Sequence, residues 1–309
     1  ETGNHTMLDE TARGVFTIAA TPFLPDGTLD EGSLDRMTDF YLEKGATGLT
    51  ILGIMGEAGK LSADESARVI ELVCARANVP VIVGVSAPGL AAIEALSKVA
   101  MDNGAAGVMV APPASLKTDG QIVTYFQTVA SRLGKIPWVL QDFPLVTSVV
   151  IDPGVILKIV ENCPTMKMLK HEDWPGLEKI AALRRASDAG GRRISILCGN
   201  GGQFLLEEMI RGADGAMTGF AYPEMMRDVV ALMNAGNESS ARDLFDAYLP
   251  LIRFESQPGL GLAIRKYILA KRGAIAHDTV RAPGPKLSTE AVAEIDALIA
   301  RQTARLAAH

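Results

Sequence analysis

The chain of 309 residues contains little cysteine, and its three cysteines are far apart in the sequence. Cys74, Cys163 and Cys198 form no Cys-x-x-Cys pair, and no histidine stands beside any of them. This pattern predicts neither a disulfide framework nor a zinc site, and it makes a reducing cytoplasm the expected compartment.

Long basic clusters and long apolar segments are also missing. Lysines and arginines occur in groups of no more than two or three, and the net charge is −6, so nucleic acid is not an expected partner. No apolar segment reaches the roughly 18 residues of a membrane span. No low-complexity linker divides the chain, which we expect to form one domain. Apolar residues make up 48% of it, enough for a large core.

What the chain does contain is a regular alternation of short apolar segments and longer amphipathic ones. Strands that alternate with helices pair in parallel through right-handed crossovers. Eight such strands predict a closed (β/α)8 TIM barrel rather than an open sheet. The expected strands are Gly14–Ala20, Gly48–Leu52, Val79–Gly84, Gly107–Val110, Trp138–Gln141, Thr165–Lys170, Ile194–Cys198 and Gly215–Thr218; the helices between them include Leu34–Lys44, Ala63–Ala77, Leu90–Asn103 and Gln121–Leu133.

Helix boundaries and a C-terminal extension can also be predicted. Ser62 and Glu65 have the spacing of a capping box, Ser288 marks a second helix start, and Lys44-Gly45 and Asn103-Gly104 mark helix ends. Residues 1–6, before Met7, look like an expression tag. The apolar stripe of Leu244, Tyr248, Leu251 and Ile252 predicts packing against the barrel, with a subunit contact as the alternative. The expected divisions are 1–13 for the tag and N-terminal segment, 14–236 for the barrel and 237–309 for a C-terminal helical region; the expected late helices are Pro223–Asn234, Ser239–Phe254, Leu260–Lys271 and Thr289–Leu306.

The predicted strand ends carry the polar residues. In a barrel of this type the active site lies at the C-terminal ends of the strands. A polar site in an apolar barrel therefore requires polar and glycine residues at that level, and seven strands supply them in order. They are Thr21-Pro22-Phe23, Gly53 to Glu57, Ala111-Pro112-Pro113, Gln141 to Pro144, Lys170-His171-Glu172, Cys198 to Gly202, and Thr218-Gly219-Phe220.

Lys170 is the candidate nucleophile. Met166, Met168 and Lys170 share one face of the sixth strand, because side chains alternate with a period of two. Burial disfavours the charged ammonium, and a neutral amine attacks carbonyl carbons. A lysine that simply extends into solvent from the strand end is the alternative. Lys167 is a weaker candidate, since it faces the other way and lies deeper.

These residues give the chain a resemblance to a known superfamily. Thr21-Pro22-Phe23, Gly53-x-x-Gly56-Glu57 with Leu61-Ser62-x-x-Glu65, the Pro144 turn, and Lys170 with Glu172 resemble the dihydrodipicolinate synthase/N-acetylneuraminate lyase superfamily over nearly all of residues 14–305. The resemblance implies a barrel that forms tetramers or dimers and a Schiff base between Lys170 and a 2-oxo acid. It also implies that neither a metal nor an organic cofactor is required.

Departures from the superfamily pattern narrow the expected reaction. Gln141 replaces a proton-carrying Tyr, Ile54 replaces a relay Thr, Pro113-Ala114 replaces a second Tyr, and Val146 replaces a carboxylate-binding Arg. These losses argue against ordinary dihydrodipicolinate synthase activity. The chain is more similar to 2-keto-3-deoxy-L-arabonate dehydratases, which share Gln-Asp-x-Pro. Further matches to them are Gly215-Ala-Met-Thr-Gly219, Leu249-Pro-Leu-Ile252 with Glu255, and Gly273-Ala-Ile-Ala276.

Roles for the other candidates stay open at this point. Glu57 is expected either to carry protons or to brace its own turn, and Gln141 to orient a water or a hydroxyl. Asp142 lines the site or faces the barrel wall, and His171 is expected to pack behind its strand. Gly53, Ile54 and Met55 offer backbone N–H groups for a substrate carboxylate. The expected substrate-binding set is Thr21, Gly53, Ile54, Met55, Asp142, Asn200, Gly201 and Thr218.

The leading functional hypothesis is a Schiff-base lyase that acts on a small 2-oxo acid, preferably as the dehydratase of a 2-keto-3-deoxy sugar acid. A pyruvate aldolase or synthase of the same superfamily and an imino-acid deaminase are the enzymatic alternatives. A barrel that has lost catalysis and serves in binding or regulation is the alternative from a different class.

Overall fold

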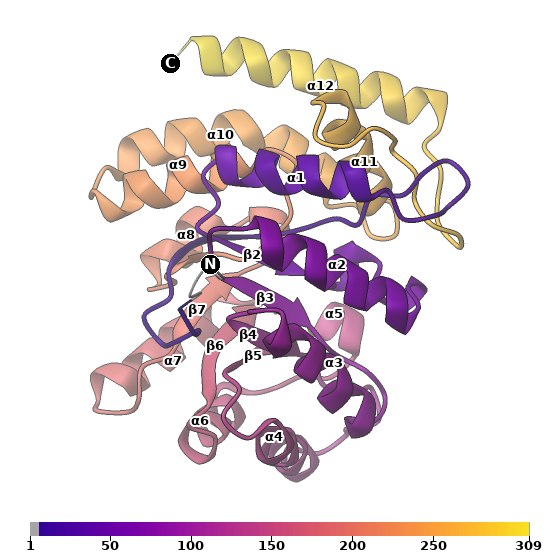
Figure 1. Ribbon diagram of the computed structural model, residues 1–309. Coiled ribbons are helices and arrows are strands. Elements are labelled where there is room, and N and C mark those ends of the chain that lie inside the picture. Colours follow the sequence, from indigo (N-terminus) through magenta and orange to yellow (C-terminus); the bar gives the residue numbers. More distant parts are fainter. Residues whose placement is uncertain (1–5, 309) are drawn as a thin grey trace.

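The computed structural model describes residues 6–308, and over that range eight parallel strands close into a barrel (Figure 1). The predicted (β/α)8 architecture is confirmed. Each predicted strand overlaps an observed one, with ends that differ by no more than two residues. Residues 1–5 of the expected tag lie outside the described part. The strands are β1 (Gly14–Ile18), β2 (Gly48–Ile51), β3 (Val81–Gly84), β4 (Gly107–Val110), β5 (Trp138–Asp142), β6 (Met166–His171), β7 (Ser195–Cys198) and β8 (Gly215–Ala216).

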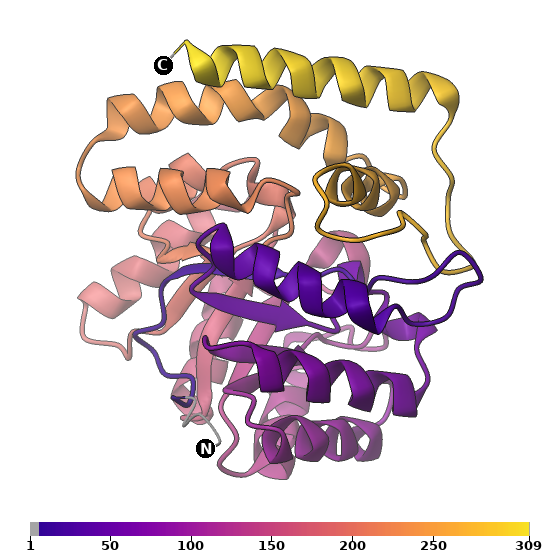
Figure 2. The same cartoon turned by 45° about the horizontal axis from the view of Figure 1, so that its top comes forward.

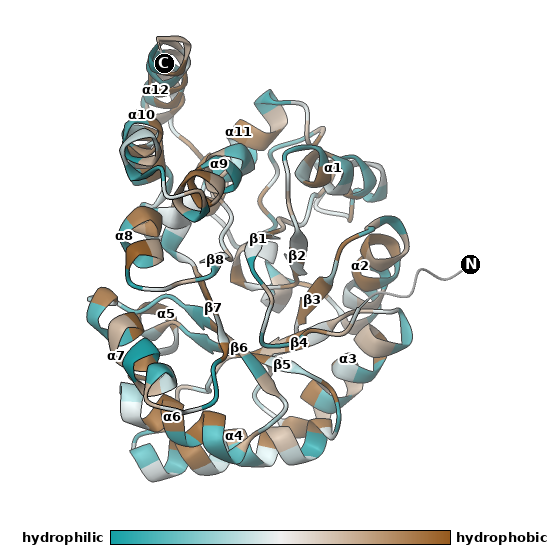
Figure 3. Cartoon of the chain, turned by 90° about the vertical axis from the view of Figure 1, so that its left-hand side faces the viewer, coloured by the Kyte–Doolittle hydropathy of each residue, from teal (hydrophilic) through white to brown (hydrophobic). Residues whose placement is uncertain are grey.

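Helices surround the strands, and the last three extend beyond this ring on one side (Figure 3). The helices that follow the strands are α1 (Glu31–Glu43), α2 (Ala63–Arg76), α3 (Leu90–Asp102), α4 (Asp119–Leu133), α5 (Pro144–Thr147), α6 (Pro153–Asn162), α7 (Leu177–Asp188), α8 (Leu205–Ile210) and α9 (Pro223–Asn234). The later ones are α10 (Glu238–Glu255), α11 (Gly261–Lys271) and α12 (Thr289–Ala307), and short 3-10 turns are η1 (Ile54–Gly56), η2 (Ala58–Lys60) and η3 (Asn200–Gly202).

The predicted helix boundaries follow from local hydrogen bonds. Ser62 and Glu65 form the reciprocal capping box that opens α2, and Ser288 caps α12 through the amide of Ala291. Lys44 and Asn103 end α1 and α3. These bonds satisfy backbone groups that a helix end would otherwise leave without partners, which is why the sequence alone located them.

The barrel interior is apolar below the C-terminal ends of the strands. Side chains on one face of the strands fill it, among them Val139, Met168 and Leu197. Side chains on the other face form a larger cluster between the sheet and the surrounding helices. Because the alternation has a period of two, Gln141 follows Val139, and Lys170 follows Met168, on the interior face.

The C-terminal helices pack on one another and on the last barrel helix. Helix α9 contacts β1 and β8, α10 packs on α9, and α12 lies along α10 (Figure 2). In the expected apolar stripe, Tyr248, Leu251 and Ile252 are buried within the chain, and Leu244 packs partly buried beside them. Packing inside the chain, the first of the two readings, is therefore the observed one. Within residues 6–308 no helix has the length and apolar character to cross a membrane.

A buried carboxyl on α8 makes stability depend on pH. Burial raises the pKa of Glu208 to about 8, and a hydrogen bond with Cys198 opposes the rise. The folded chain therefore holds a proton here that the unfolded chain releases above its ordinary pKa near 4.5. This group's contribution to the free energy of unfolding consequently falls as the pH rises from about 4.5 to about 8.

We predict that Glu208→Gln weakens this pH dependence, because an amide keeps the shape but does not titrate. Between pH 5 and 8, the slope of the free energy of unfolding against pH should become less steep by at most about 1.4 kcal/mol per pH unit. Urea unfolding of both proteins at several pH values measures it. An unchanged slope in the variant would show that Glu208 is already ionised in the folded chain.

Candidate active site

Lys170 lies near the end of β6 and points into the barrel. It pairs in register with Gln141 of β5 and Leu197 of β7. The residue is only 6% exposed, and its Nζ lies 2.7 Å from Oε1 of Glu172. A buried ammonium in an otherwise apolar barrel is thus stabilised by a carboxylate two residues further along the chain, just past the end of β6.

Glu172 is a further candidate residue of the site, and the sequence analysis assigned it no role. Its Oε1 also accepts a hydrogen bond of 3.2 Å from Nε2 of Gln141, and its Oε2 accepts one of 3.4 Å from the amide of Asn200. Its own amide donates to the carbonyl of Asp142, so the strand pairing continues one residue past β6. The alternation that turns Lys170 inward also turns Glu172 inward. This alternation was the signal in the sequence that could have identified Glu172 as a site residue.

Gly199 makes room for that carboxylate. A Cβ atom at position 199 would lie 2.4 Å from Cγ of Glu172 and 2.5 Å from its Cδ, closer than real contacts allow. Gly199 follows β7 directly, and its amide donates to the carbonyl of His171. The glycine therefore permits Glu172 to lie between the ends of β5, β6 and β7.

Asp142 does not line the barrel interior, so the expectation that it binds substrate is not supported. It is fully buried behind the sheet, where the Nζ of Lys179 on α7 lies 2.7 Å from its Oδ2. Nδ1 of His171 lies 4.0 Å from the same oxygen. The period of two explains this place, since Asp142 follows the inward Gln141 and His171 follows the inward Lys170. His171 packs behind its strand, as expected.

Burial and the charges behind the sheet shift the pKa values of Asp142 and His171. Burial raises the pKa of Asp142 to about 6, and the Lys179 ammonium opposes the rise. Burial, assisted by the same ammonium, lowers the pKa of His171 to about 4. At neutral pH this layer therefore consists of a carboxylate, an ammonium and a neutral imidazole, held away from the barrel interior.

The ends of β1 and β2 form a second part of the candidate site. Thr21 is buried, and its hydroxyl donates to the carbonyl of Gly56 over 2.6 Å. Gly53 lies beside Met109 of the barrel interior, Met55 packs against the interior cluster, and the Ile54 side chain is 46% exposed. The first amides of the 3-10 turn η1 have no partner within that turn, which leaves them for a ligand or for water.

The turn η3, which follows β7, forms a third part of the candidate site. The amide of Gly201 donates to Oγ1 of Thr218 over 2.8 Å, which joins η3 to the segment after β8. Asn200 and Gly201 both have positive φ values, so the chain turns sharply here and aims the Asn200 amide at Glu172. The structure thus brings together three of the expected residues, Asn200, Gly201 and Thr218, and places Glu172 beside them.

The carboxylate of Glu57 binds three groups from neighbouring segments. Its Oε1 lies 2.5 Å from the Nζ of Lys266, and its Oε2 accepts from the Nζ of Lys60 at 3.0 Å and the amide of Arg281 at 2.9 Å. Between them, these donors engage both carboxylate oxygens. The arrangement favours the bracing role over proton transfer.

Lys167 belongs to a different environment. Its Nζ lies 2.9 Å from Oε1 of Glu10, near the N-terminal end of the barrel, and that oxygen also accepts from Arg192. The side chain is thus neutralised away from Glu172, which supports Lys170 as the nucleophile.

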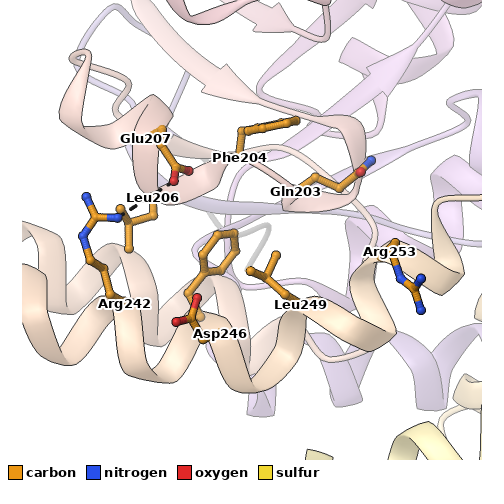
Figure 4. Close-up of a pocket in the computed structure, with 9 residues that line it drawn as sticks. Gln203, Phe204, Leu206, Glu207, Arg242, Asp246, Leu249 and Arg253 are labelled. Carbon is orange, nitrogen blue, oxygen red and sulfur yellow. Dashed lines mark ion pairs between the residues drawn. The ribbon is translucent and has the colours of Figure 1, made fainter.

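A groove of about 350 Å³ lies elsewhere, between α8 and α10 (Figure 4). Leu249 of α10 faces Phe204 across it, and Arg242 and Glu207 lie together at one end with a nitrogen–oxygen distance of 4.0 Å. The groove borders η3 but does not include Lys170 or Glu172. Its lining is Gln203, Phe204, Leu206, Glu207, Arg242, Phe245, Asp246, Leu249 and Arg253.

Comparison with known proteins places this arrangement in a family. The model of the dihydrodipicolinate synthetase family matches residues 11–302. The chain belongs to this family. Its members are lyases that bind small molecules.

Individual relatives carry different names. A crystal structure of dihydrodipicolinate synthase from Rhodopseudomonas palustris is 54% identical, with a TM-score of 0.94 and coverage of 96% of this chain and 99% of that one. L-2-keto-3-deoxyarabonate dehydratase from Azospirillum brasilense is 30% identical over 94% of each chain. 4-Hydroxy-tetrahydrodipicolinate synthase from Rhizobium meliloti is 29% identical over 92% of this chain and 96% of its own.

We predict that Glu57→Gln acts mainly on stability. The change leaves the buried Lys266 ammonium without its counter-charge, so the free energy of unfolding should fall by about 3–5 kcal/mol. Glu71→Gln is the control, because Glu71 pairs with Arg68 on the surface and should cost no more than about 1 kcal/mol. Denaturant unfolding and turnover at saturating substrate are measured on the same preparations. Unchanged stability with turnover lower by about 10²–10⁴-fold would instead make Glu57 the proton carrier.

Proposed function

We propose that this protein is a Schiff-base lyase for a 2-oxo acid and that it dehydrates a 2-keto-3-deoxy sugar acid such as 2-keto-3-deoxy-L-arabonate. The observation that carries the proposal is the buried group of Lys170, Glu172 and Gln141. It provides a nucleophilic amine, a carboxylate and an amide on one side of the barrel. The named dehydratase among the relatives, and the Gln-Asp-x-Pro pattern around Gln141, favour dehydration over condensation.

In the proposed mechanism, Glu172 accepts a proton from the Lys170 ammonium, and the neutral amine attacks C2 of the 2-oxo acid. One amine proton then moves to the C2 oxygen, Glu172 returns to that oxygen the proton it had accepted, and the oxygen leaves as water. The resulting iminium withdraws electrons from C3, and Glu172 is again a carboxylate. The iminium itself is the electron sink, so the chemistry needs no metal and no organic cofactor. The substrate carboxylate is held by the amides of the Gly53–Met55 turn.

Glu172 then carries the proton that drives dehydration. It removes a proton from C3 to give an enamine, and it returns a proton to the C4 hydroxyl as the C4–O bond breaks and water leaves. Hydrolysis of the remaining imine consumes one water and releases Lys170. Gln141 holds the Glu172 carboxylate and, lacking a titrating group, serves as its orienting partner.

A synthase reaction is the second candidate, and the name of the 54% identical Rhodopseudomonas palustris protein favours it. Three residues of this chain oppose a synthase reaction. The apolar side chain of Ile54 and the amide of Gln141 cannot relay protons as hydroxyl groups do, and the exposed Val146 cannot bind a carboxylate as an arginine does. From the resemblance we also propose that the protein forms a tetramer or a dimer and acts in the cytoplasm.

Covalent trapping is the first test. Borohydride in the presence of pyruvate should add the mass of the reduced adduct at Lys170, because reduction fixes the imine on the attacking amine. Lys170→Ala should abolish the labelling, and Lys167→Ala is the matched control that should leave it intact. Labelling at Lys167, or none with any 2-oxo acid, would refute the imine mechanism.

Glu172→Gln tests the proton carrier. The amide keeps the size of the side chain but cannot accept a proton, so turnover should fall by about 10²–10⁴-fold while trapping at Lys170 persists. Gly199→Ala should lower turnover in the same direction, because the new methyl group displaces the Glu172 carboxylate. Gly154→Ala, with no atom near its added Cβ, is the control. Full turnover in Glu172→Gln would assign proton transfer to another group.

The reaction class is tested with two substrate mixtures. Dehydration of 2-keto-3-deoxy-L-arabonate should proceed faster than condensation of pyruvate with aspartate semialdehyde, since the hydroxyl relay and the arginine of the synthases are replaced here. Product formation is followed by chromatography at equal enzyme concentration. Efficient condensation with no dehydration would establish the synthase reading.

A further inference from the structure

Lys266 of α11 is a fully buried lysine at the junction of the C-terminal region and the barrel. Its ammonium contacts Oε1 of Glu57 at 2.5 Å, the carbonyl of Thr21 at 2.6 Å and the carbonyl of Thr279 at 2.9 Å. An ammonium has three donors, and each has a partner here. The ammonium also lies 4.5 Å from the centre of the Phe23 ring.

The contacts of Lys266 reach two strand ends at the site. Thr21 follows β1, Glu57 closes the turn after β2, and the Thr21 hydroxyl already bonds to the carbonyl of Gly56. Lys266 therefore links both segments to a helix that lies outside the barrel ring. Thr279, in the loop after α11, ties the C-terminal chain to the same point.

The β2 turn needs an external constraint. Leu52 and Glu57, which flank the turn, have φ values of 56° and 57°, a left-handed conformation that non-glycine residues rarely adopt. Backbone bonds from Gly56 and Glu57 to the carbonyls of Gly53 and Ile54 span the turn but do not fix its position over the barrel. Contacts from outside the turn set that position: the Thr21 hydroxyl bonds to the Gly56 carbonyl, and Lys266 binds the Glu57 carboxylate.

We propose that Lys266 is a positioning residue for substrate binding, through which α11 holds the β2 turn and the end of β1 in the geometry that receives the 2-oxo acid carboxylate. The inference rests on the proposed function. Lys266 lies outside the reacting group and acts through Glu57 and Thr21. The C-terminal region is thus part of the substrate-binding scaffold and does more than cover the barrel.

The proposal differs from simple tethering in what it predicts for kinetics. A tether would affect stability alone. A positioning residue also sets the affinity for the carboxylate and leaves the chemistry of Lys170 and Glu172 unchanged, because no contact joins Lys266 to either residue among the described contacts.

The test uses Lys266→Met with pyruvate as the probe. The pyruvate concentration that gives half-maximal borohydride trapping should rise about tenfold, the effect of one lost hydrogen bond to the turn, while the maximal trapping rate changes by less than about threefold. Amide hydrogen exchange in residues 48–60 should quicken in the same variant. Lys271→Met is the matched control, since Lys271 lies on the same helix and pairs with Asp296 at the surface. It should change neither quantity.

A second variant covers the case in which Lys266→Met does not fold. Lys266→Met/Glu57→Gln removes both members of the fully buried pair, so no fully buried charge is left without its partner. Lys60 also loses the Glu57 carboxylate, but its side chain is 25% exposed and keeps its bond to the carbonyl of Arg281. This double variant should fold and still show the raised half-saturation and the faster exchange. Lys266→Arg, which keeps the charge but not the three contacts, should fall between Lys266→Met and the unaltered protein.

The outcomes separate the two claims. A lower melting temperature with unchanged half-saturation and unchanged exchange in residues 48–60 would overturn the positioning role and leave a tether. Absence of trapping in the unaltered protein would refute the proposed function. In that case faster exchange confined to residues 48–60 would still support the brace between α11 and the β2 turn, and unchanged exchange would refute it.

Discussion

A buried ammonium requires a counter-charge, and this requirement organises the candidate site at the C-terminal ends of the strands. Below Lys170 the interior is filled by side chains such as Met168, Val139 and Leu197, which offer no hydrogen bonds. Glu172, 2.7 Å away, supplies the charge from the position that follows β6. Gln141, the Asn200 amide and the space left by Gly199 then follow from the need to hold that carboxylate.

The sheet separates two sets of charges that lie close together in the sequence. Lys170 and Glu172 face inward, whereas His171 and Asp142 face outward toward Lys179 of α7. This separation keeps the outward carboxylate from competing for the Lys170 ammonium. On the opposite side of the barrel the Glu57–Lys266 pair serves the backbone, since its contacts run to the carbonyls of Thr21 and Thr279.

The sequence was a good guide to the elements and to the inward direction of Lys170. Short apolar segments between longer amphipathic ones located the strands, period-two alternation turned Lys170 inward, and capping residues located helix starts. These signals depend on near neighbours in the chain. The partners of Glu57 were not predictable, since Lys266 lies more than 200 residues away in the sequence. The role of Glu172 was within reach of the alternation argument, but its contact with Gln141 and the clearance at Gly199 depend on how three strands meet.

In the proposed mechanism, Lys170 and Glu172 act together on the carbon next to an imine. Exchange of the C3 protons of pyruvate in deuterium oxide, followed by proton NMR, tests it directly and does not depend on the identity of the natural substrate. The account predicts rapid exchange with the unaltered protein, none with Lys170→Ala, and exchange slower by about 10²–10⁴-fold with Glu172→Gln. Exchange at the unaltered rate in Glu172→Gln would contradict it.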